Sequence, residues 1–265
     1  MIELNRIYNE DCLEGMERIG DSSIDLVVTS PPYDNLRTYG NDIDKTWGEH
    51  IWKPILKELY RVIKNGGVVV WIVGDATIKG SETGTSFRQA LYAMACGFNL
   101  HDTMIWEKIS PFSNSNRYIP NFEYMFILSK GTPKTANIIE DRKNKYAGIA
   151  VHGTRRNKVG VLSNISESEN KKVIKEYGAR FNTWNISGDT INKTGHPAVF
   201  PKRLAYDHVI TWSNEKDLIL DPFMGSGTTA IACIDSNRNF IGFELNKEYY
   251  NIATRRIEEN KMKLF

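Results

Sequence analysis

The sequence predicts an α/β protein built on a doubly wound, mostly parallel sheet. Short runs rich in β-branched residues alternate along the chain with stretches in which apolar residues recur every three or four positions. Continuous apolar runs of this length are typical of strands that are covered on both faces of a parallel sheet. With 265 residues, the chain is long enough to bury such a core without disulfides or structural metals.

Five runs are predicted as strands because turn-forming residues bound them. These strands span residues 23–29, 68–73, 122–128, 218–220 and 240–243. The helical spacing is found in residues 52–63, 85–96, 228–235 and 247–260. In the second of these helices, Phe87, Leu91 and Ala95 are expected to face the core.

The stretch from 138 to 194 interrupts this alternation and is predicted to be an insertion. It is polar, and from Asp141 to Arg180 it holds ten basic and four acidic residues, although the whole chain has a net charge of only +2. Such an excess fits either a solvated surface or a surface that contacts phosphates. The chain is therefore divided at 1–137, 138–194 and 195–265, with the first and last parts forming one domain.

The cysteines and histidines indicate neither disulfides nor a metal site. Cys12, Cys96 and Cys233 are widely spaced, which is typical of a reduced intracellular protein. His152 and His196 lack neighbouring ligands, so no metal is expected. The amino terminus has no signal-peptide core, and no apolar run is long enough to span a bilayer. We therefore expect a cytoplasmic protein without a membrane partner.

A glycine-containing loop follows the strand predicted at 218–220 and opens the next helix. It reads Asp221-Pro222-Phe223-Met224-Gly225-Ser226-Gly227-Thr228-Thr229. Two glycines let the backbone turn sharply and approach a ligand closely. Glu244 ends the next strand about 20 residues on, where an acid can accept hydrogen bonds from ribose hydroxyls. The pattern predicts a nucleoside site, although a Gly-x-Gly turn alone is also found in plain strand-to-helix connections.

The chemistry of this loop favours a cationic ligand over a phosphate. The loop lacks the third glycine of dinucleotide sites, and no Gly-Lys-Ser/Thr follows it. Asp221 stands ahead of the glycines, where a carboxylate would repel a pyrophosphate. S-adenosylmethionine carries a sulfonium and an ammonium and has no phosphate. It is therefore the cofactor that we expect.

A second loop, Thr29-Ser30-Pro31-Pro32-Tyr33, follows the strand predicted at 23–29. A bare Pro-Pro pair indicates a rigid turn. Here it also offers two acceptors, the Ser30 hydroxyl and the Pro31 carbonyl, which can hold the hydrogens of an exocyclic amine and free its lone pair for in-line attack. The ring of Tyr33 can stack on a base extruded from a duplex. No cysteine lies in this loop, so methyl transfer through a covalent cysteine adduct is excluded.

Together, TSPPY and the later DPFMGSGTT resemble the motif pair of bacterial and phage DNA amino-methyltransferases, which modify N4 of cytosine or N6 of adenine. Their order is similar to that of the permuted, or beta, group of this family. The resemblance covers nearly the whole chain and implies a Rossmann-like methyltransferase fold, S-adenosylmethionine as cofactor and DNA as partner. It identifies 1–137 as the catalytic half, 138–194 as a target-recognition insertion and 195–265 as the cofactor-binding half.

The resemblance also implies roles for individual residues. The segment from Asn9 to Cys12 resembles the one whose aspartate contacts the cofactor adenine, and the segment from His196 to Pro201 resembles the one lining the methionine end. The expected cofactor-binding residues are Asp11, Cys12, Thr29, Phe200, Asp221, Pro222, Phe223, Gly225, Ser226, Gly227, Thr228, Glu244, Leu245 and Asn246. The expected catalytic residues are Ser30, Pro31, Pro32 and Tyr33. The candidate DNA contacts are Arg37, Arg155, Arg156 and Lys158.

The first residue of the catalytic loop favours cytosine N4 as the acceptor. Ser-Pro-Pro-Tyr resembles the cytosine-N4 enzymes, whereas Asp-Pro-Pro-Tyr is commoner in the adenine-N6 enzymes. A hydroxyl can donate to cytosine N3 as well as accept, but adenine N1 is also an acceptor, so both bases stay open. A catalytically silent DNA-binding module and an RNA or protein-amide methyltransferase are the alternatives of other classes. Family members are often dimers from restriction–modification systems, which makes a homodimer and a cognate restriction endonuclease candidate partners.

Overall fold

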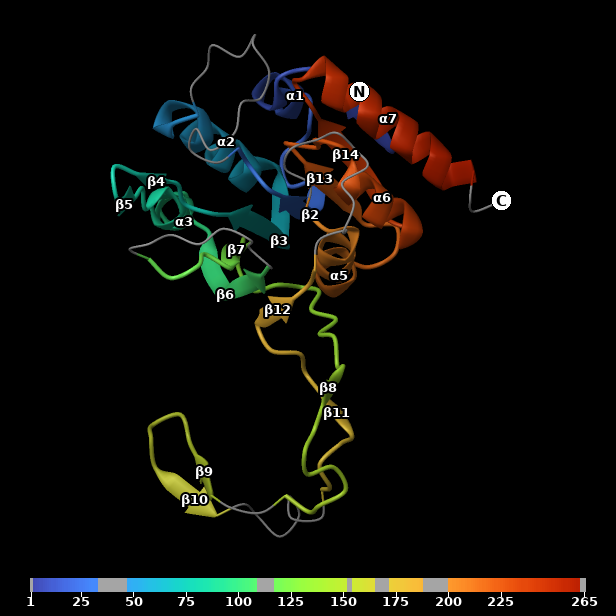
Figure 1. Ribbon diagram of the computed structural model, residues 1–265. Helices are drawn as coiled ribbons and strands as arrows, with labels where there is room; N and C mark the ends of the chain where they lie inside the picture. Colours follow the sequence, from blue (N-terminus) through green and yellow to red (C-terminus); the bar gives the residue numbers. More distant parts are fainter. Residues whose placement is uncertain are drawn as a thin grey trace. The chain divides into compact units, whose positions relative to one another are not determined.

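The computed structural model describes residues 2–32, 47–108, 117–151, 154–164, 172–187 and 200–262. Among the expected site residues, Tyr33 and Arg37 lie outside these ranges, and the side chain of Arg155 is likewise not described. The chain divides into two compact units (Figure 1). One comprises Met1–Asn137 with Asn182–Phe265, and the other comprises Ile138–Phe181.

An eight-stranded sheet forms the centre of the first unit. Its strands lie in the order β1 (Arg6–Tyr8), β14 (Asn239–Phe243), β13 (Leu218–Asp221), β2 (Ile24–Thr29), β3 (Ile63–Val73), β7 (Phe122–Ser129), β6 (Asn99–Glu107) and β12 (Thr183–Asn185). The first five are parallel. Strand β7 runs antiparallel to β3 and β6, and β12 is parallel to β6. The mostly parallel sheet predicted from the sequence is confirmed.

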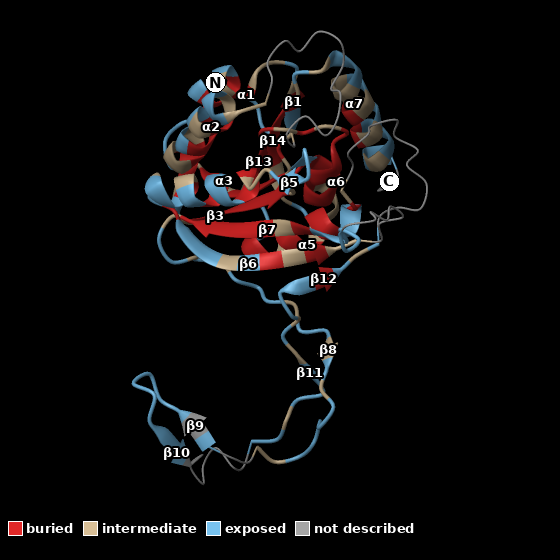
Figure 2. Cartoon of the chain, turned by 60° about the vertical axis from the view of Figure 1, so that its left-hand side comes forward, coloured by how far each residue is buried: buried red, intermediate tan, exposed pale blue. Residues whose placement is uncertain are grey.

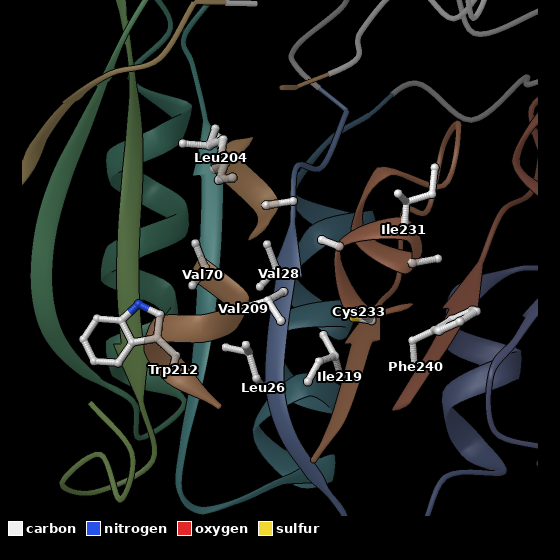
Figure 3. Packing of buried hydrophobic residues seen from close by; sticks show 14 of the residues in the cluster. Leu26, Val28, Val70, Leu204, Val209, Trp212, Ile219, Ile231, Cys233 and Phe240 are labelled. Atoms are coloured by element: carbon white, nitrogen blue, oxygen red, sulfur yellow. The ribbon is translucent and has the colours of Figure 1, made fainter. Parts of the chain in front are cut away.

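Helices cover both faces of this sheet. One face packs against α1 (Cys12–Glu17), α2 (Glu49–Val62) and α3 (Thr85–Ala95), and the other against α5 (Lys202–Trp212), α6 (Thr228–Asp235) and α7 (Lys247–Met262). Side chains of β2 alternate between the two cores, so that Leu26 and Val28 meet the second set of helices (Figure 3) while Ile24 and Val27 meet the first. The sheet is therefore doubly wound, as expected.

Helix α3 buries a different face from the one that the apolar spacing predicted. Phe87 and Leu91 are 48% and 65% exposed, whereas Gln89, Ala90 and Ala93 are buried. Small side chains allow the helix to lie close to the sheet, and the Oε1 atom of Gln89 accepts a hydrogen bond of 2.8 Å from the indole N–H of Trp71. A polar side chain whose Oε1 atom is hydrogen-bonded, although its Nε2 atom has no hydrogen-bond partner among the residues described, thus takes the place in the core that was predicted for apolar ones. A short hairpin, β4 (Thr77–Ile78) and β5 (Ser81–Glu82), precedes this helix.

The second unit, Ile138–Phe181, consists of two short antiparallel pairs. Strand β8 (Arg142–Lys143) pairs with β11 (Tyr177–Gly178), and β9 (Thr154–Arg156) pairs with β10 (Leu162–Asn164). The predicted insertion extended to residue 194, but β12 belongs to the main sheet because Trp184 is buried there and stacks on His208 at 4.5 Å. The second unit therefore ends at Phe181, earlier than the predicted boundary. None of the helices described has the length and hydropathy needed to span a lipid bilayer.

Candidate active site

The carboxyl ends of four neighbouring parallel strands bring the expected cofactor and catalytic residues to one edge of the sheet. Strand β1 leads to Asp11 and Cys12, and β14 leads to Glu244, Leu245 and Asn246. Strand β13 leads into the glycine loop, and β2 leads into Thr29-Ser30-Pro31-Pro32. Because these strands are adjacent in the order β1-β14-β13-β2, segments far apart in the sequence meet there (Figure 1).

The glycine loop is held tightly against its surroundings. Gly225 and Gly227 have φ angles of 53° and 85°, in the left-handed region that favours glycine. A Cβ atom on Gly227 would also lie 3.1 Å from the Cβ of Ala253 in α7. The amide N–H of Met224 donates to the carbonyl of Phe243 at 2.8 Å, which ties the loop to β14. The loop therefore has a fixed shape with its backbone at the sheet edge.

Glu244 braces the same loop from the end of β14. Its Oε2 atom accepts from the Gly225 N–H and its Oε1 atom from the Asn246 N–H, both at 2.8 Å. Burial raises the pKa of this carboxyl to about 7, and the two backbone donors oppose that change. Each oxygen keeps a lone pair beyond these bonds, so the side chain can still accept from a ligand hydroxyl.

Asp221 joins the glycine loop to the proline loop. It is 1% exposed, and its Oδ1 atom accepts from the Thr29 hydroxyl at 2.6 Å and from the Phe223 N–H at 3.0 Å. Burial raises its pKa to about 6, against the effect of these hydrogen bonds and of one from Thr229. One carboxylate oxygen thus fixes the start of both loops.

The two carboxyl groups test whether the loop suits S-adenosylmethionine. Neither Asp221 nor Glu244 forms an ion pair with a Lys, Arg or His side chain in the part of the chain that the structure describes. Buried carboxylates are stable when a positive charge compensates them. A ligand bearing a sulfonium and an ammonium supplies that charge, whereas a phosphate would add repulsion. The residues present therefore fit this cofactor.

The proline loop begins where β2 ends. Thr29 is fully buried and pairs with Trp71 of β3, Pro31 is buried, and Ser30 and Pro32 are partly exposed. Ser30 is therefore the first residue past the strand that is open to solvent. Tyr33, the fourth expected catalytic residue, lies outside the described residues.

The remaining expected cofactor residues lie around this edge. Asp11 caps α1 by accepting from the Leu13 N–H at 2.8 Å, and Phe200 packs against the core just before α5. Cys12 is buried, and burial raises the pKa of its thiol, which keeps it protonated and unreactive. Leu245 is exposed.

Three of the four DNA contacts expected from the sequence, Arg155, Arg156 and Lys158, belong to the second unit, and the fourth, Arg37, lies outside the described residues. Arg156 ends β9, Lys158 lies in the turn that follows, and both are exposed.

Two residues near the cofactor loop were missed by the sequence analysis. The guanidinium of Arg256 in α7 donates to the carbonyl of Ser226 and, at 2.7 Å, to its hydroxyl. The side-chain amide of Asn9 donates to the carbonyls of Glu244 and Leu245 at 2.8 and 3.1 Å. Nothing in the sequence distinguishes Arg256 from other basic residues of its helix, whereas Asn9 stands in a segment already assigned to the cofactor.

A family model described as DNA methylase matches residues 24–255. The chain belongs to this DNA methylase family. It is 52% identical over 256 residues to the orphan methyltransferase M.BamHII of Bacillus amyloliquefaciens, covering 91% of each chain. The similarity between this DNA methyltransferase and that relative therefore extends over nearly the whole of both chains.

Solved structures confirm the fold of this DNA methyltransferase. The PvuII DNA methyltransferase, described as cytosine-N4-specific, superposes with a TM-score of 0.68 at 22% identity, covering 97% of this chain and 91% of that one. The M1.HpyAVI–SAM complex gives a TM-score of 0.61 at 22% identity, covering 95% and 98%. The Rossmann-like methyltransferase fold is thereby shown, and the family is S-adenosylmethionine-dependent.

Proposed function

We propose that this DNA methyltransferase transfers a methyl group from S-adenosylmethionine to the exocyclic N4 of a cytosine flipped out of DNA. One observation carries the proposal: the 2.6 Å hydrogen bond between Thr29 and Asp221 joins the proline loop to the cofactor loop on adjacent strands. Two substrates held by these loops meet at one edge of the sheet. Holding two reactants in line in this way can lower the barrier by about 7–11 kcal/mol.

Each loop has a separate task in this reaction. Glu244 would accept hydrogen bonds from the ribose of the cofactor, and the backbone at Gly225 and Gly227 would approach it without interference from a Cβ atom. The cofactor supplies the methyl group from its sulfonium. The Ser30 hydroxyl and the Pro31 carbonyl accept hydrogen bonds from the amine, which draws its nitrogen toward tetrahedral geometry and frees the lone pair. Pro31 and Pro32 keep these acceptors rigid.

Ser30 supports cytosine N4 over adenine N6. A hydroxyl at this position donates as well as accepts, so it can serve the amine and the neighbouring ring nitrogen of either base, and the preference for cytosine rests on the resemblance of Ser-Pro-Pro-Tyr to the cytosine-N4 enzymes. The related PvuII enzyme is described as cytosine-N4-specific. Adenine N6 is the second candidate, because the matching family model covers both acceptors.

The second unit is proposed to recognise the target sequence, with DNA as its partner. A homodimer is a further proposal, which sedimentation with and without DNA would test. The relative M.BamHII is described as an orphan, so the proposed function does not require a cognate restriction endonuclease.

Methyl transfer measured on several substrates tests the proposed function. The chain would be incubated with methyl-labelled S-adenosylmethionine and, in parallel, duplex DNA, RNA and protein. We expect label in duplex DNA alone, recovered after digestion as N4-methylcytosine. Ser30→Ala should lose transfer, while Leu91→Ala, a change at an exposed position of α3, should retain it. Label only in RNA or protein would overturn the proposal, and N6-methyladenine alone would overturn the choice of base.

A further inference from the structure

The second unit has no core of its own. Not one of the residues described within Ile138–Phe181 is buried, and β8 to β11 are tan and pale blue in Figure 2. Nine large apolar side chains of this unit are at least 44% exposed, among them Tyr146, Val159, Leu162 and Phe181. Folded proteins rarely leave so many large apolar side chains exposed in so short a segment, and surfaces of this kind usually contact a partner.

Hydrogen bonds and polar side-chain contacts, rather than buried apolar side chains, hold the unit together. The guanidinium of Arg142 lies 4.8 Å from the centre of the Phe181 ring, and Lys175 pairs with Glu140 at 3.2 Å. Exposed ion pairs contribute little to stability. Fixing a chain in one conformation costs entropy that buried apolar surface ordinarily offsets. We expect the unit to become fully ordered only when a partner covers its apolar side chains.

The charge of the unit identifies the chemistry of this partner. Ile138–Phe181 holds ten basic and five acidic residues, a net charge of +5, so the rest of the chain carries −3 of the total of +2. This asymmetry suits a polyanion. The partner must also offer apolar surface, because the exposed side chains of the unit are apolar as well as basic.

The β9–β10 hairpin combines both kinds of side chain. Leu162 pairs with Arg156 across the two strands, and the turn between them carries Lys158, Val159 and Val161. A two-stranded ribbon fits the major groove of B-DNA, where thymine methyl groups and base edges are accessible next to phosphates. Duplex DNA therefore offers the anionic and apolar contacts that this hairpin presents.

We propose that the Ile138–Phe181 unit completes its fold on duplex DNA, with the apolar side chains of the β9–β10 hairpin packing against bases and its basic residues contacting phosphates. This inference rests on the proposed function and extends it: target recognition is coupled to ordering of the recognising unit. Part of the binding free energy then offsets the entropy lost when the unit becomes ordered. Only DNA that contacts the apolar side chains as well as the charged ones supplies enough of it.

Hydrogen exchange of the full chain with S-adenosylmethionine tests this coupling. Amides of 138–181 would be followed alone, with sheared genomic duplex DNA, and with heparin, a polyanion without bases. We expect exchange to slow by about tenfold or more with duplex DNA and to change little with heparin. Full protection without DNA, equal protection by heparin, or protection that appears when the protein concentration alone is raised would each overturn the inference. The last result would assign the surface to a second copy of the chain.

A pair of matched variants tests the role of the apolar side chains. Leu162→Ser removes a side chain that is 59% exposed in the hairpin, and Leu91→Ser removes one that is 65% exposed in α3. Neither change opens a core. We expect Leu162→Ser to weaken duplex binding about tenfold and Leu91→Ser to leave it unchanged, with the affinity for S-adenosylmethionine equal in both. Equal duplex binding by both variants would overturn the inference.

Methyl transfer measured in the same samples separates two kinds of failure. Wild-type chain that transfers no methyl group to DNA would contradict the proposed function. Wild-type chain that methylates DNA while its second unit shows no change in exchange would contradict only the coupling.

Discussion

Replacing Glu244 by glutamine should remove the part of the stability of the cofactor-free protein that is lost as the pH rises, while weakening cofactor binding. Burial raises the pKa of this carboxyl from its ordinary value of 4.5 to about 7. The folded chain therefore binds the proton more tightly than the unfolded chain does. The resulting stabilisation is complete below about pH 4.5 and is lost as the pH rises through about 7.

The size of the effect follows from these two pKa values. Between pH 5.5 and 8, ionisation of Glu244 removes about 2 kcal/mol of the wild-type free energy of unfolding. Glutamine does not ionise, so Glu244→Gln lacks this loss. The melting temperature of the variant relative to wild type should therefore rise by about 4–8 °C from pH 5.5 to 8. Loss of charged acceptors for the ribose should weaken cofactor binding by about 10–100-fold at pH 8.

Thermal unfolding at pH 5.5 and 8, together with calorimetric titration of S-adenosylmethionine, measures both effects. Glu248→Gln makes the same charge change at an exposed position in the first turn of α7, and it should alter neither quantity. If the melting temperatures of wild type and Glu244→Gln change equally from pH 5.5 to 8, the reasoning is refuted, because the carboxyl of Glu244 is then not held in a desolvated site.

Two further changes probe the active site, and a third probes the second unit. Thr29→Val removes the hydroxyl that donates to Asp221, so the rate of single-turnover methyl transfer at saturating substrates should fall about tenfold. Thr29→Ser keeps a hydroxyl and should restore the rate. A wild-type rate for Thr29→Val would contradict the link between the loops. Arg256→Met should raise the KM for S-adenosylmethionine about fivefold with kcat nearly unchanged, in steady-state kinetics, because the arginine donates to Ser226 of the cofactor loop. Combining Arg156→Gln with Lys158→Gln should reduce the slope of log affinity for DNA against log salt by about 2, and an unchanged slope would exclude both from phosphate contact.

The parts of the fold that the sequence predicts best are those whose residues are mostly apolar or buried. Strand β2 and helix α6 match the predicted ranges to within one residue, because continuous burial produces continuous apolar runs. The proline loop and the glycine loop follow strands, as predicted, since glycine and proline mark turns independently of packing. Because the strands before these two loops are parallel, both loops lie at the same edge of the sheet.

Other elements carry weaker signals. Strand β6 has the sequence Asn-Leu-His-Asp-Thr-Met-Ile-Trp-Glu, and its first residues are mostly exposed. These polar residues interrupt the alternation of apolar and polar residues by which a strand is recognised. Helix α3 presents Leu91 to solvent and Gln89 to the core, and only the position of Trp71 makes that arrangement favourable. Arg256 acts on a loop 30 residues away in the sequence, which no local pattern reveals.

The nucleoside formed in DNA tests the central claim most directly. Host DNA would be mapped by modification-sensitive sequencing after expression of the wild-type chain and of Ser30→Ala, and the modified nucleosides would be identified after digestion. If the methyl group is transferred to the cytosine amine, host DNA should contain N4-methylcytosine at one short sequence after expression of the wild-type chain. It should contain no N4-methylcytosine there after expression of Ser30→Ala. N6-methyladenine as the sole product, or N4-methylcytosine formed equally by both chains, would contradict the account.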